Sequence, residues 1–314
     1  MSNLIFSLNA TLPVFLLMVL GMVFRKLNII SEQFAIEMNK FVFLIPLPVM
    51  VFKDLATVDF KEAWNGKFVF FCFVVTLISI LIAILLSYLM KDKKTQGEFI
   101  QVSYRSSAAI LGIALINNIY GDSVMGPLMI IGSVPLYNMM AVVVLSLFSE
   151  ESNLKDIELW KKTLKGIITN PIIIGIVVGI LWSLLNLPYP SIMEKSVSYI
   201  SNLATPMGLL SMGATFNLKK AQGALKESLV ASFMKLLGYA MIFLPFAVSF
   251  GFREDQLIAI LIMLGSASTV SCYTMARNMG HEGILTSNTV MITTLLSGFT
   301  ITLWIFILRS MGMV

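Results

Sequence analysis

The sequence has little charge for its length. Of its 314 residues, 12% are charged and 57% are hydrophobic, whereas soluble domains carry about a quarter of charged residues. A soluble core cannot bury so much apolar surface, so we expect a protein that lies in a lipid bilayer. The net charge of +5 does not indicate nucleic-acid binding, because the basic residues are scattered over short loops rather than gathered in one patch.

Residues that carry enzyme chemistry are also scarce. The one histidine, His281, stands beside a glycine in an expected loop, and the two cysteines, Cys72 and Cys272, lie in apolar segments. We therefore expect no disulfide framework. The sequence has no Cys/His ligand cluster and no nucleophile motif such as G-x-S-x-G. It predicts a protein that is not an enzyme, with no metal site and no cofactor.

Ten apolar stretches are long enough to cross a bilayer, and they predict an all-α integral membrane protein. They cover approximately residues 4–24, 34–52, 68–90, 98–120, 124–148, 167–186, 196–216, 229–250, 256–277 and 284–309. Basic residues concentrate in the loops after the odd-numbered stretches, which places those loops in the cytoplasm. These residues are Arg25, Lys26, Lys91, Lys93, Lys94, Lys155, Lys161, Lys162, Lys165, Lys219, Lys220, Lys226 and Arg277. The expected location is the cell membrane, with several passes and both termini on the non-cytoplasmic side.

The two halves of the chain resemble each other. At one constant offset, three residues of the first half fall on identical residues of the second; the pairs are Pro13 and Pro171, Gly21 and Gly179, and Pro48 and Pro206. Each half holds five stretches, an odd number, so the second half would be inserted upside down relative to the first. We expect two inverted repeats at 1–150 and 167–314, joined by a cytoplasmic connector at 151–166.

One stretch in each half is rich in small and hydroxylated residues, although it lies at membrane depth. These are Ser103–Gly121 and Gly265–Gly280. Such residues loosen a helix, and irregular backbone in a membrane is tolerated where it is enclosed by protein or lines a cavity. Two interrupted segments in corresponding positions of two halves are the best sequence indication of a transporter's substrate site. Gly112 is a candidate break in the first stretch.

Over all ten stretches the sequence resembles the auxin efflux carrier family. The similar segments are F-L-I-P-L-P-V-M at Phe43–Met50, N-P-I-I-I-G-I-V-V-G-I-L at Asn170–Leu181, A-T-P-M-G-L-L-S-M-G-A-T at Ala204–Thr215, the run from Arg105 and the closing run from Thr294. The resemblance implies secondary transport of organic anions such as mono- and dicarboxylates. It also implies broken fourth and ninth helices that cross near the membrane centre, a scaffold domain beside a moving domain, and a homodimer formed through the scaffold.

The sequence departs from the family pattern at the two expected breaks. The family usually has a proline at each break, and here Ala114 and Ala267 stand at those positions. Without proline, the breaks must depend on glycine, serine and threonine, which are poorer helix formers than alanine. We interpret Pro48 and Pro206 as kinks that shape the scaffold rather than as ligands.

Arg105, about seven residues into the fourth stretch, is the most prominent charge at membrane depth. A guanidinium group matches a carboxylate in bidentate fashion, so Arg105 is a candidate partner for an anionic substrate. The alternative is that its side chain extends to the cytoplasmic surface. We expect the side chains of Lys235 and Lys40 to extend to the cytoplasmic surface in this way.

Other candidate substrate-binding residues surround the two interruptions and offer hydroxyls, amides or bare backbone N–H groups, which favour anions at helix N-termini. They are Ser106, Ser107, Ala108, Asn117, Asn138, Gly265, Ser266, Ser268, Thr269 and Ser271. The alternative role of the small residues is close helix packing, and Asn138 has the alternative of bonding a neighbouring helix.

The sequence thus predicts a secondary active transporter that carries a small organic anion by alternating access. A membrane sensor that kept the carrier fold without transporting is the alternative. We find no carboxylate in the middle of any expected helix, which argues against proton coupling through a buried Asp or Glu. A Na⁺ site made of backbone carbonyls and hydroxyls at the broken helices stays open.

Overall fold

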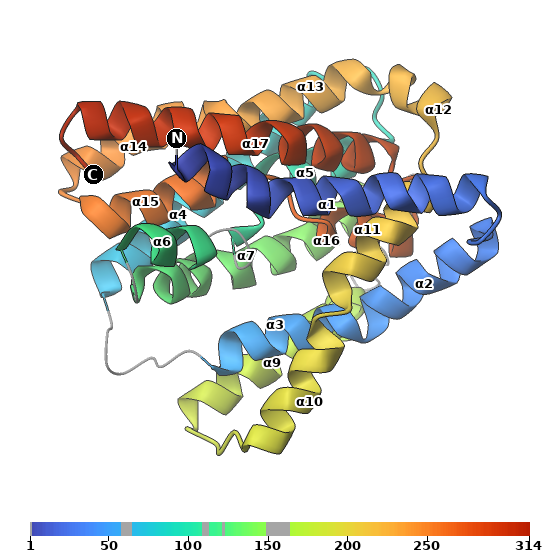
Figure 1. Ribbon diagram of the computed structural model, residues 1–314, viewed down its shortest axis with the longest axis horizontal. Coiled ribbons are helices and arrows are strands. Elements are labelled where there is room, and N and C mark those ends of the chain that lie inside the picture. Colours follow the sequence, from blue (N-terminus) through green and yellow to red (C-terminus); the bar gives the residue numbers. More distant parts are fainter. Residues whose placement is uncertain (1, 58–64, 109–112, 121–122, 149–163) are drawn as a thin grey trace.

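The computed structural model consists of α-helices joined by short loops (Figure 1). It describes residues 2–57, 65–108, 113–120, 123–148 and 164–314. Five helical stretches in these ranges are long and apolar enough to cross a membrane: Glu32–Ala56, Gly66–Ser87, Met125–Leu147, Leu225–Ser249 and Ile284–Ser310. The chain is therefore a helical membrane protein with several passes.

The helices follow one another with few residues between them. In chain order they are α1 (Ser2–Lys26), α2 (Glu32–Leu44), α3 (Pro46–Ala56), α4 (Gly66–Ser87), α5 (Gln96–Tyr104), α6 (Ile113–Tyr120), α7 (Met125–Leu147), α9 (Pro171–Leu184), α10 (Ser191–Ser201), α11 (Ala204–Ala214), α12 (Leu218–Gly223), α13 (Leu225–Phe233), the π-helical turn η2 (Met234–Gly238), α14 (Tyr239–Ser249), α15 (Glu254–Gly265), α16 (Ser271–Asn278) and α17 (Ile284–Ser310).

Two helical spans are interrupted just ahead of a proline-containing turn. α2 ends before Ile45, whose φ of −126° and ψ of −68° leave the helical region, and α3 then starts at Pro46. Pro48 lies in the first turn of α3, where a missing N–H breaks no helical bond. In the second half, α10 ends at Ser201 and α11 begins at Ala204, with Pro206 in its first turn. Both prolines therefore stand at the beginning of a helix, directly after an interruption.

The helices form two groups. One contains α1, α2, α3, α9, α10 and α11, with α3 packed along α9 and α1 packed along α11. The other contains α4, α5, α7 and α13 to α17, in which α4 packs on α7, α13 on α17 and α14 on α15. The groups meet where α1 contacts α17 and where α16 contacts α2 and α11. Figure 1 shows α3, α9 and α10 at one end of the molecule and α13, α14 and α17 at the other.

Equivalent glycines allow the two closest helix pairs in the first group. A Cβ atom on Gly179 of α9 would lie 2.9 Å from the Phe52 carbonyl oxygen of α3, and a Cβ on Gly21 of α1 would collide with the Leu210 carbonyl oxygen of α11. The same offset that separates Gly21 from Gly179 also separates Phe52 from Leu210. Small residues let membrane helices approach closely, and here they do so at corresponding places in the two halves of the chain.

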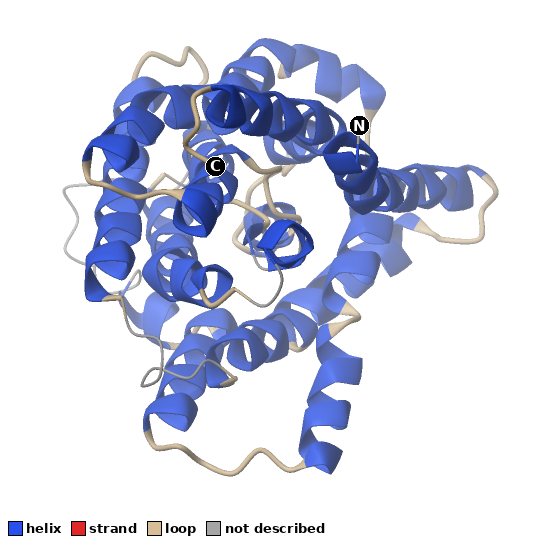
Figure 2. Ribbon diagram, turned by 60° about the vertical axis from the view of Figure 1, so that its left-hand side comes forward, coloured by secondary structure: helices blue, strands red, loops and turns tan. Residues whose placement is uncertain are grey.

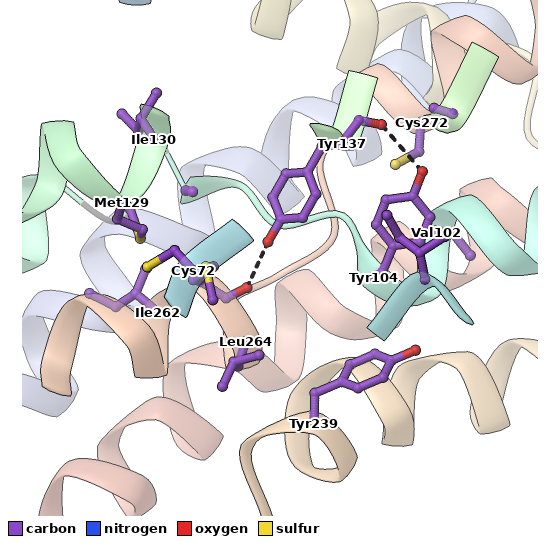
Figure 3. Packing of buried hydrophobic residues seen from close by; sticks show 14 of the residues in the cluster. Cys72, Val102, Tyr104, Met129, Ile130, Tyr137, Tyr239, Ile262, Leu264 and Cys272 are labelled. Carbon is purple, nitrogen blue, oxygen red and sulfur yellow. Dashed lines mark hydrogen bonds between the residues drawn. The ribbon is translucent and has the colours of Figure 1, made fainter. Parts of the chain in front are cut away.

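Irregular backbone lies inside the molecule as well as at its ends (Figure 2). Around it packs an aromatic core that includes Tyr104, Tyr137 and Tyr239, shown in Figure 3 beside Cys72 and Cys272. The Tyr104 hydroxyl donates to the carbonyl of Tyr137 at 3.2 Å, and the Tyr137 hydroxyl donates to the carbonyl of Met263 at 3.2 Å. These bonds join α5, α7 and α15, so the buried hydroxyls have partners, as burial requires.

Candidate functional site

Two helices stop in the interior of the protein without a proline. α5 ends at Tyr104, and Arg105 takes an extended conformation with φ −75° and ψ 130°. α15 ends at Gly265, and Ser266 is likewise extended, with φ −78° and ψ 167°. The helical path of α15 resumes only at Ser271, where α16 begins. Most described residues after these helix ends are small and give a helix little side chain to pack: Ser106, Ser107 and Ala108 after α5, and Ser266, Ala267, Ser268 and Thr269 after α15.

The two interruptions cross and bond to each other. Ser106 and Ser268 form an isolated antiparallel bridge, and the backbone N–H of Ser107 donates to the carbonyl of Ala267 at 2.9 Å. The Ser268 hydroxyl donates to the Val102 carbonyl at 2.8 Å, and its N–H donates to the Thr293 hydroxyl at 3.1 Å. Backbone groups released by each broken helix are thus satisfied by the other one, which is how irregular backbone can persist in a buried setting. We call this region the crossing.

Arg105 lies at the crossing and not at the cytoplasmic surface, since it is only 2% exposed. One terminal nitrogen, Nη2, donates to Asn138 Oδ1 at 2.7 Å and to Ser271 Oγ at 2.8 Å. The other, Nη1, donates to Met275 Sδ at 2.9 Å and to Gln101 Oε1 at 3.4 Å. These partners come from α5, α7 and α16, and all of them are neutral.

The guanidinium therefore keeps its positive charge without a neutralising partner among these contacts. Its third nitrogen, Nε, is buried and has no hydrogen-bond partner among the described residues. A buried cation that is neither paired nor fully hydrogen-bonded is costly. A negatively charged group with matching acceptor oxygens beside it would recover the free energy lost in this arrangement.

A cavity opens next to Arg105. The crossing and α7 provide its polar side, with Arg105, Ser106, Ser107, Ala108, Tyr137, Asn138, Thr269 and Ser271. Leu47, Met50 and Val51 of α3 and Ile172 of α9 form an apolar wall opposite, and Asp54 and Val134 complete the lining. The cavity thus lies between the two helix groups, with hydroxyls and a cation on one side and aliphatic side chains on the other.

The structure brings most of the predicted site residues to this place. Arg105, Ser106, Ser107, Ala108, Asn138, Thr269 and Ser271 line the cavity. Ala267 and Ser268 line a second, smaller one, together with Thr11 of α1, Thr205 of α11 and Thr294 of α17. Gly265 and Ser266 line neither cavity. Gly265 packs near the Leu236 carbonyl, and the Ser266 hydroxyl is buried without a partner in the described region. Gly112 lies outside the described residues. Ala114 and Asn117 belong to α6, and their side chains lie outside the description.

Sequence reasoning missed other residues of the site. Asp54 lies beyond the expected second stretch, 34–52, but α3 continues to Ala56 and carries Asp54 into the cavity lining. Gln101 and Met275 carried no signal of their own, because their roles depend on the position of Arg105. The expectation for Lys235 is wrong. Its side chain does not reach the surface but is fully buried, and Nζ donates to the Leu264 carbonyl at 2.6 Å.

Comparison with known proteins agrees with a membrane transporter. The sequence pattern of the membrane transport protein family matches residues 6–305, almost the whole chain. The chain therefore belongs to this family, that of the auxin efflux carriers, and the resemblance found in the sequence is confirmed. It is also 20% identical over 307 residues to an uncharacterized transporter of Methanothermobacter thermautotrophicus, a match that covers 96% of this chain and 98% of that protein.

Proposed function

We propose that this protein is a secondary active transporter of a small organic anion, a mono- or dicarboxylate, and that it works by alternating access. The family supports transport across a membrane. The observation that supports an anionic substrate is the environment of Arg105. Its buried guanidinium has neutral partners, one N–H without a partner among the described residues, and a cavity beside it. A carboxylate would supply the two oxygens that such a fork accommodates.

The residues that line the cavity support a small carboxylate in particular. Serine and threonine hydroxyls beside Arg105 can donate to carboxylate oxygens, while the aliphatic wall of α3 and α9 can hold the carbon skeleton. Ligand sites of this kind are mostly apolar, with a few polar groups that fix the orientation. Asp54 of α3, which also lines the cavity, disfavours a second negative charge close to it while it is ionised.

The proposed architecture is ten spans in two inverted five-helix repeats, with α5–α6 and α15–α16 as the broken fourth and ninth spans. Corresponding glycine contacts in the two halves support it, and so does the left-handed backbone of Asn28 and Asn186, with φ of 57° and 47°, at the same offset. Transporters with inverted repeats bind substrate between the repeats near the bilayer midplane. The group of α1, α2, α3, α9, α10 and α11 would be the scaffold, against which the crossing moves.

The proposal also covers the location, orientation and assembly of the protein. The cell membrane with both termini outside follows from the basic residues of the loops. The family resemblance alone supports a homodimer formed through the scaffold. The coupling ion is addressed by the transport measurement, which compares Na⁺ and H⁺ gradients.

The test is uptake of labelled mono- and dicarboxylates into proteoliposomes, with a Na⁺ gradient, a proton gradient or neither. The Arg105→Ala variant is expected to take up the anion at least about tenfold more slowly, because a hydrogen bond to a charged group contributes about 1.5–3 kcal/mol. Arg105→Lys keeps the positive charge but loses the forked guanidinium, so its uptake should lie between those of wild type and Arg105→Ala.

Each outcome has a separate meaning. Saturable uptake by wild-type protein, which Arg105→Lys reduces and Arg105→Ala reduces further, would support the proposal. Uptake unchanged in Arg105→Ala would remove Arg105 from the site and leave transport standing. Binding of the acids without any flux in wild-type protein would contradict transport and favour a sensor that kept the carrier fold.

A further inference from the structure

A second basic side chain, that of Lys235, lies at the crossing, outside the cavity beside Arg105. Lys235 belongs to the π-helical turn η2 and is completely buried. Its Nζ donates at 2.6 Å to the carbonyl oxygen of Leu264, the residue before the last one of α15. Lys235 is not among the residues of the cavity beside Arg105, and the proposed chemistry of the substrate does not use it.

The end of α15 is a place where positive charge is favourable. The last carbonyls of a helix have no intrahelical partners and carry a partial negative charge. At a helix end on the surface, water satisfies them. Here α15 ends inside the protein, where the chain becomes extended at Ser266, and Leu264 is 3% exposed. A cation held within the protein therefore replaces the solvent at this helix end.

The local structure holds Lys235 in this position. The carbonyl of Leu236, in the π-helical turn, accepts a hydrogen bond from the Trp304 indole of α17 at 3.3 Å. Gly265, the last residue of α15, packs near the same carbonyl, because a Cβ there would lie 3.4 Å from it. π-Helical turns frequently occur at functional sites. The turn thus fixes the start of the lysine side chain directly beside the end of α15.

Lys235 has no acidic partner among the described residues, whose ion pairs are Arg25 with Glu32 and Lys220 with Glu282. Arg105 contacts Ser271 and Met275 of α16, whereas Lys235 contacts the end of α15, so the two basic side chains lie on the helices at either side of the second interruption. Broken helices in transporters commonly use their exposed carbonyls and C-terminal ends to hold Na⁺, and this end already has an ammonium group on it.

We propose that Lys235 is a built-in counter-charge that occupies the position of a coupling cation at the end of α15, so that anion transport by this protein does not require Na⁺. This inference rests on the proposed transport function. Lys235 is a positioning residue, since it touches the backbone of the crossing and not the substrate. It stabilises the interrupted α15 and thereby the geometry of Ser266 to Ser271, on which the anion site is built.

Replacing Lys235 with Ala should leave an empty position that a small cation can fill. In proteoliposomes, wild-type uptake should be the same with Na⁺ or choline as the only monovalent cation. Uptake by Lys235→Ala should fall at least about tenfold, in line with the loss of a favourable charge at a buried helix end. Ethylammonium should restore part of it, and tetramethylammonium, which cannot donate a hydrogen bond, should not. Lys40→Ala, which changes an exposed lysine of α2, is the control.

Thermal unfolding of the purified protein in detergent makes the test independent of transport. Lys235→Ala should unfold at a lower temperature than wild type and should be stabilised by ethylammonium relative to tetramethylammonium at equal ionic strength. Wild-type protein should respond to both in the same way. If Lys235→Ala does not fold, Lys235→Met, which keeps the length of the side chain, is measured in its place.

The results separate the two proposals. Failure of wild-type protein to take up any acid would contradict the proposed function, while selective stabilisation of the variant by ethylammonium would still support the role of Lys235. A strict Na⁺ requirement in wild-type uptake would overturn the inference. So would a variant that keeps wild-type uptake, or one that responds equally to both organic cations.

Discussion

The partners of Arg105 hold its guanidinium in place without neutralising it. Asn138 contributes an amide oxygen at 2.7 Å, and its own amide nitrogen donates to the Val134 carbonyl at 3.0 Å, which fixes which end of the amide faces Arg105. Ser271 Oγ accepts from the same guanidinium nitrogen and lies 3.2 Å from Thr269 Oγ1. An amide and a hydroxyl orient a cation while leaving its charge available to a substrate.

Replacing Asn138 with Asp should therefore inhibit transport without unfolding the protein. An aspartate there would form an ion pair with Arg105 and act as an internal competitor for the substrate carboxylate. We expect uptake to fall at least about tenfold, because a paired buried charge releases its partner only at considerable cost. The melting temperature should be equal to or higher than that of wild type.

The comparison variant is Asn138→Ala, which removes the acceptor and adds no charge. It should retain more uptake than Asn138→Asp and melt at a lower temperature, since Arg105 loses one neutral partner. If the aspartate variant transports as well as the alanine variant, the cation at this position does not bind the substrate.

At the residue level, the sequence identified the polar groups but not their assembly. Arg105 and the serines beside it could be recognised because charge and hydroxyls are rare at membrane depth. Met275 and Gln101 could not be recognised, since a thioether and an amide become partners of Arg105 only through the fold. Lys235 was misplaced for a related reason: its distance from the end of the stretch says nothing about an interior helix end nearby.

Among the helices, the interruptions occur where the backbone gains partners from another broken helix. Ser106 and Ser107 bond across the crossing to Ser268 and Ala267. A proline would impose the break through its ring and its missing N–H. In this protein alanine occupies the position instead, so the break depends on these mutual bonds and on the hydroxyl groups that add to them.

Introducing the proline that the family pattern has at position 267 should be tolerated. The residue before a proline must be extended, and Ser266 already has φ −78° and ψ 167°. Ala267→Pro should keep the melting temperature within a few degrees of wild type and keep uptake. Ala259→Pro, in the interior of α15, should cost about 3 kcal/mol or more because it removes a helical hydrogen bond and introduces a clash.

Circular dichroism melts of both variants in the same detergent make this comparison. Equal destabilisation by the two prolines would show that the backbone at position 267 does not accept proline. The result also bears on the departure from the family pattern. A tolerated proline would mean that the break with alanine in this protein and the break with proline in the family have the same backbone structure.

Element boundaries were partly predictable. The apolar stretch 34–52 corresponds to the span Glu32–Ala56, but its interruption at Ile45 and its continuation to Ala56 were not apparent from hydropathy. Hydropathy reports which residues suit lipid, whereas a helix continues past the apolar region whenever its next turns are covered by protein. That difference of one turn is what brings Asp54 to the cavity.

At the scale of the whole molecule, hydrogen bonds join the two helix groups near the ends of α11 and α16. The Thr215 and Tyr273 hydroxyls form a short hydrogen bond, and the Asn278 amide donates to the Asn39 carbonyl at 3.4 Å. Further along, Gly208 of α11 faces Val270, since a Cβ on Gly208 would lie 3.1 Å from Val270 Cγ1. If one group moves against the other during transport, these contacts must separate.

A disulfide between positions 208 and 270 should therefore stop transport. The paired variant Gly208→Cys with Val270→Cys, in a background with Cys72→Ala and Cys272→Ala, places the two Cβ atoms close to the separation of about 3.5–4.5 Å that a disulfide needs. Oxidation should abolish uptake, and dithiothreitol should restore it. The two single-cysteine variants should be insensitive to oxidation. An oxidised pair that transports at the reduced rate would contradict relative movement of α11 and the crossing.

The overall organisation was more accessible to sequence than the site was. The family and the helical membrane class follow from composition and from motifs that extend over the whole chain. The likeness of the two halves was visible because glycine and proline stand at corresponding positions where helices touch or start, as at Gly21 and Gly179. Side chains that complete the site lack such a pattern, because their positions are determined by packing between distant segments.

The positive charges at the crossing belong to the chain itself, and this has an electrical consequence. Arg105 and Lys235 return to their starting positions after every complete cycle, so a turnover without a coupling cation transfers only the charge of the substrate. With the proposed anion as substrate, each such turnover would carry current. A membrane potential of 100 mV, negative inside, contributes about 2.3 kcal/mol per elementary charge, and it would drive an anion outward through this protein without any ion gradient.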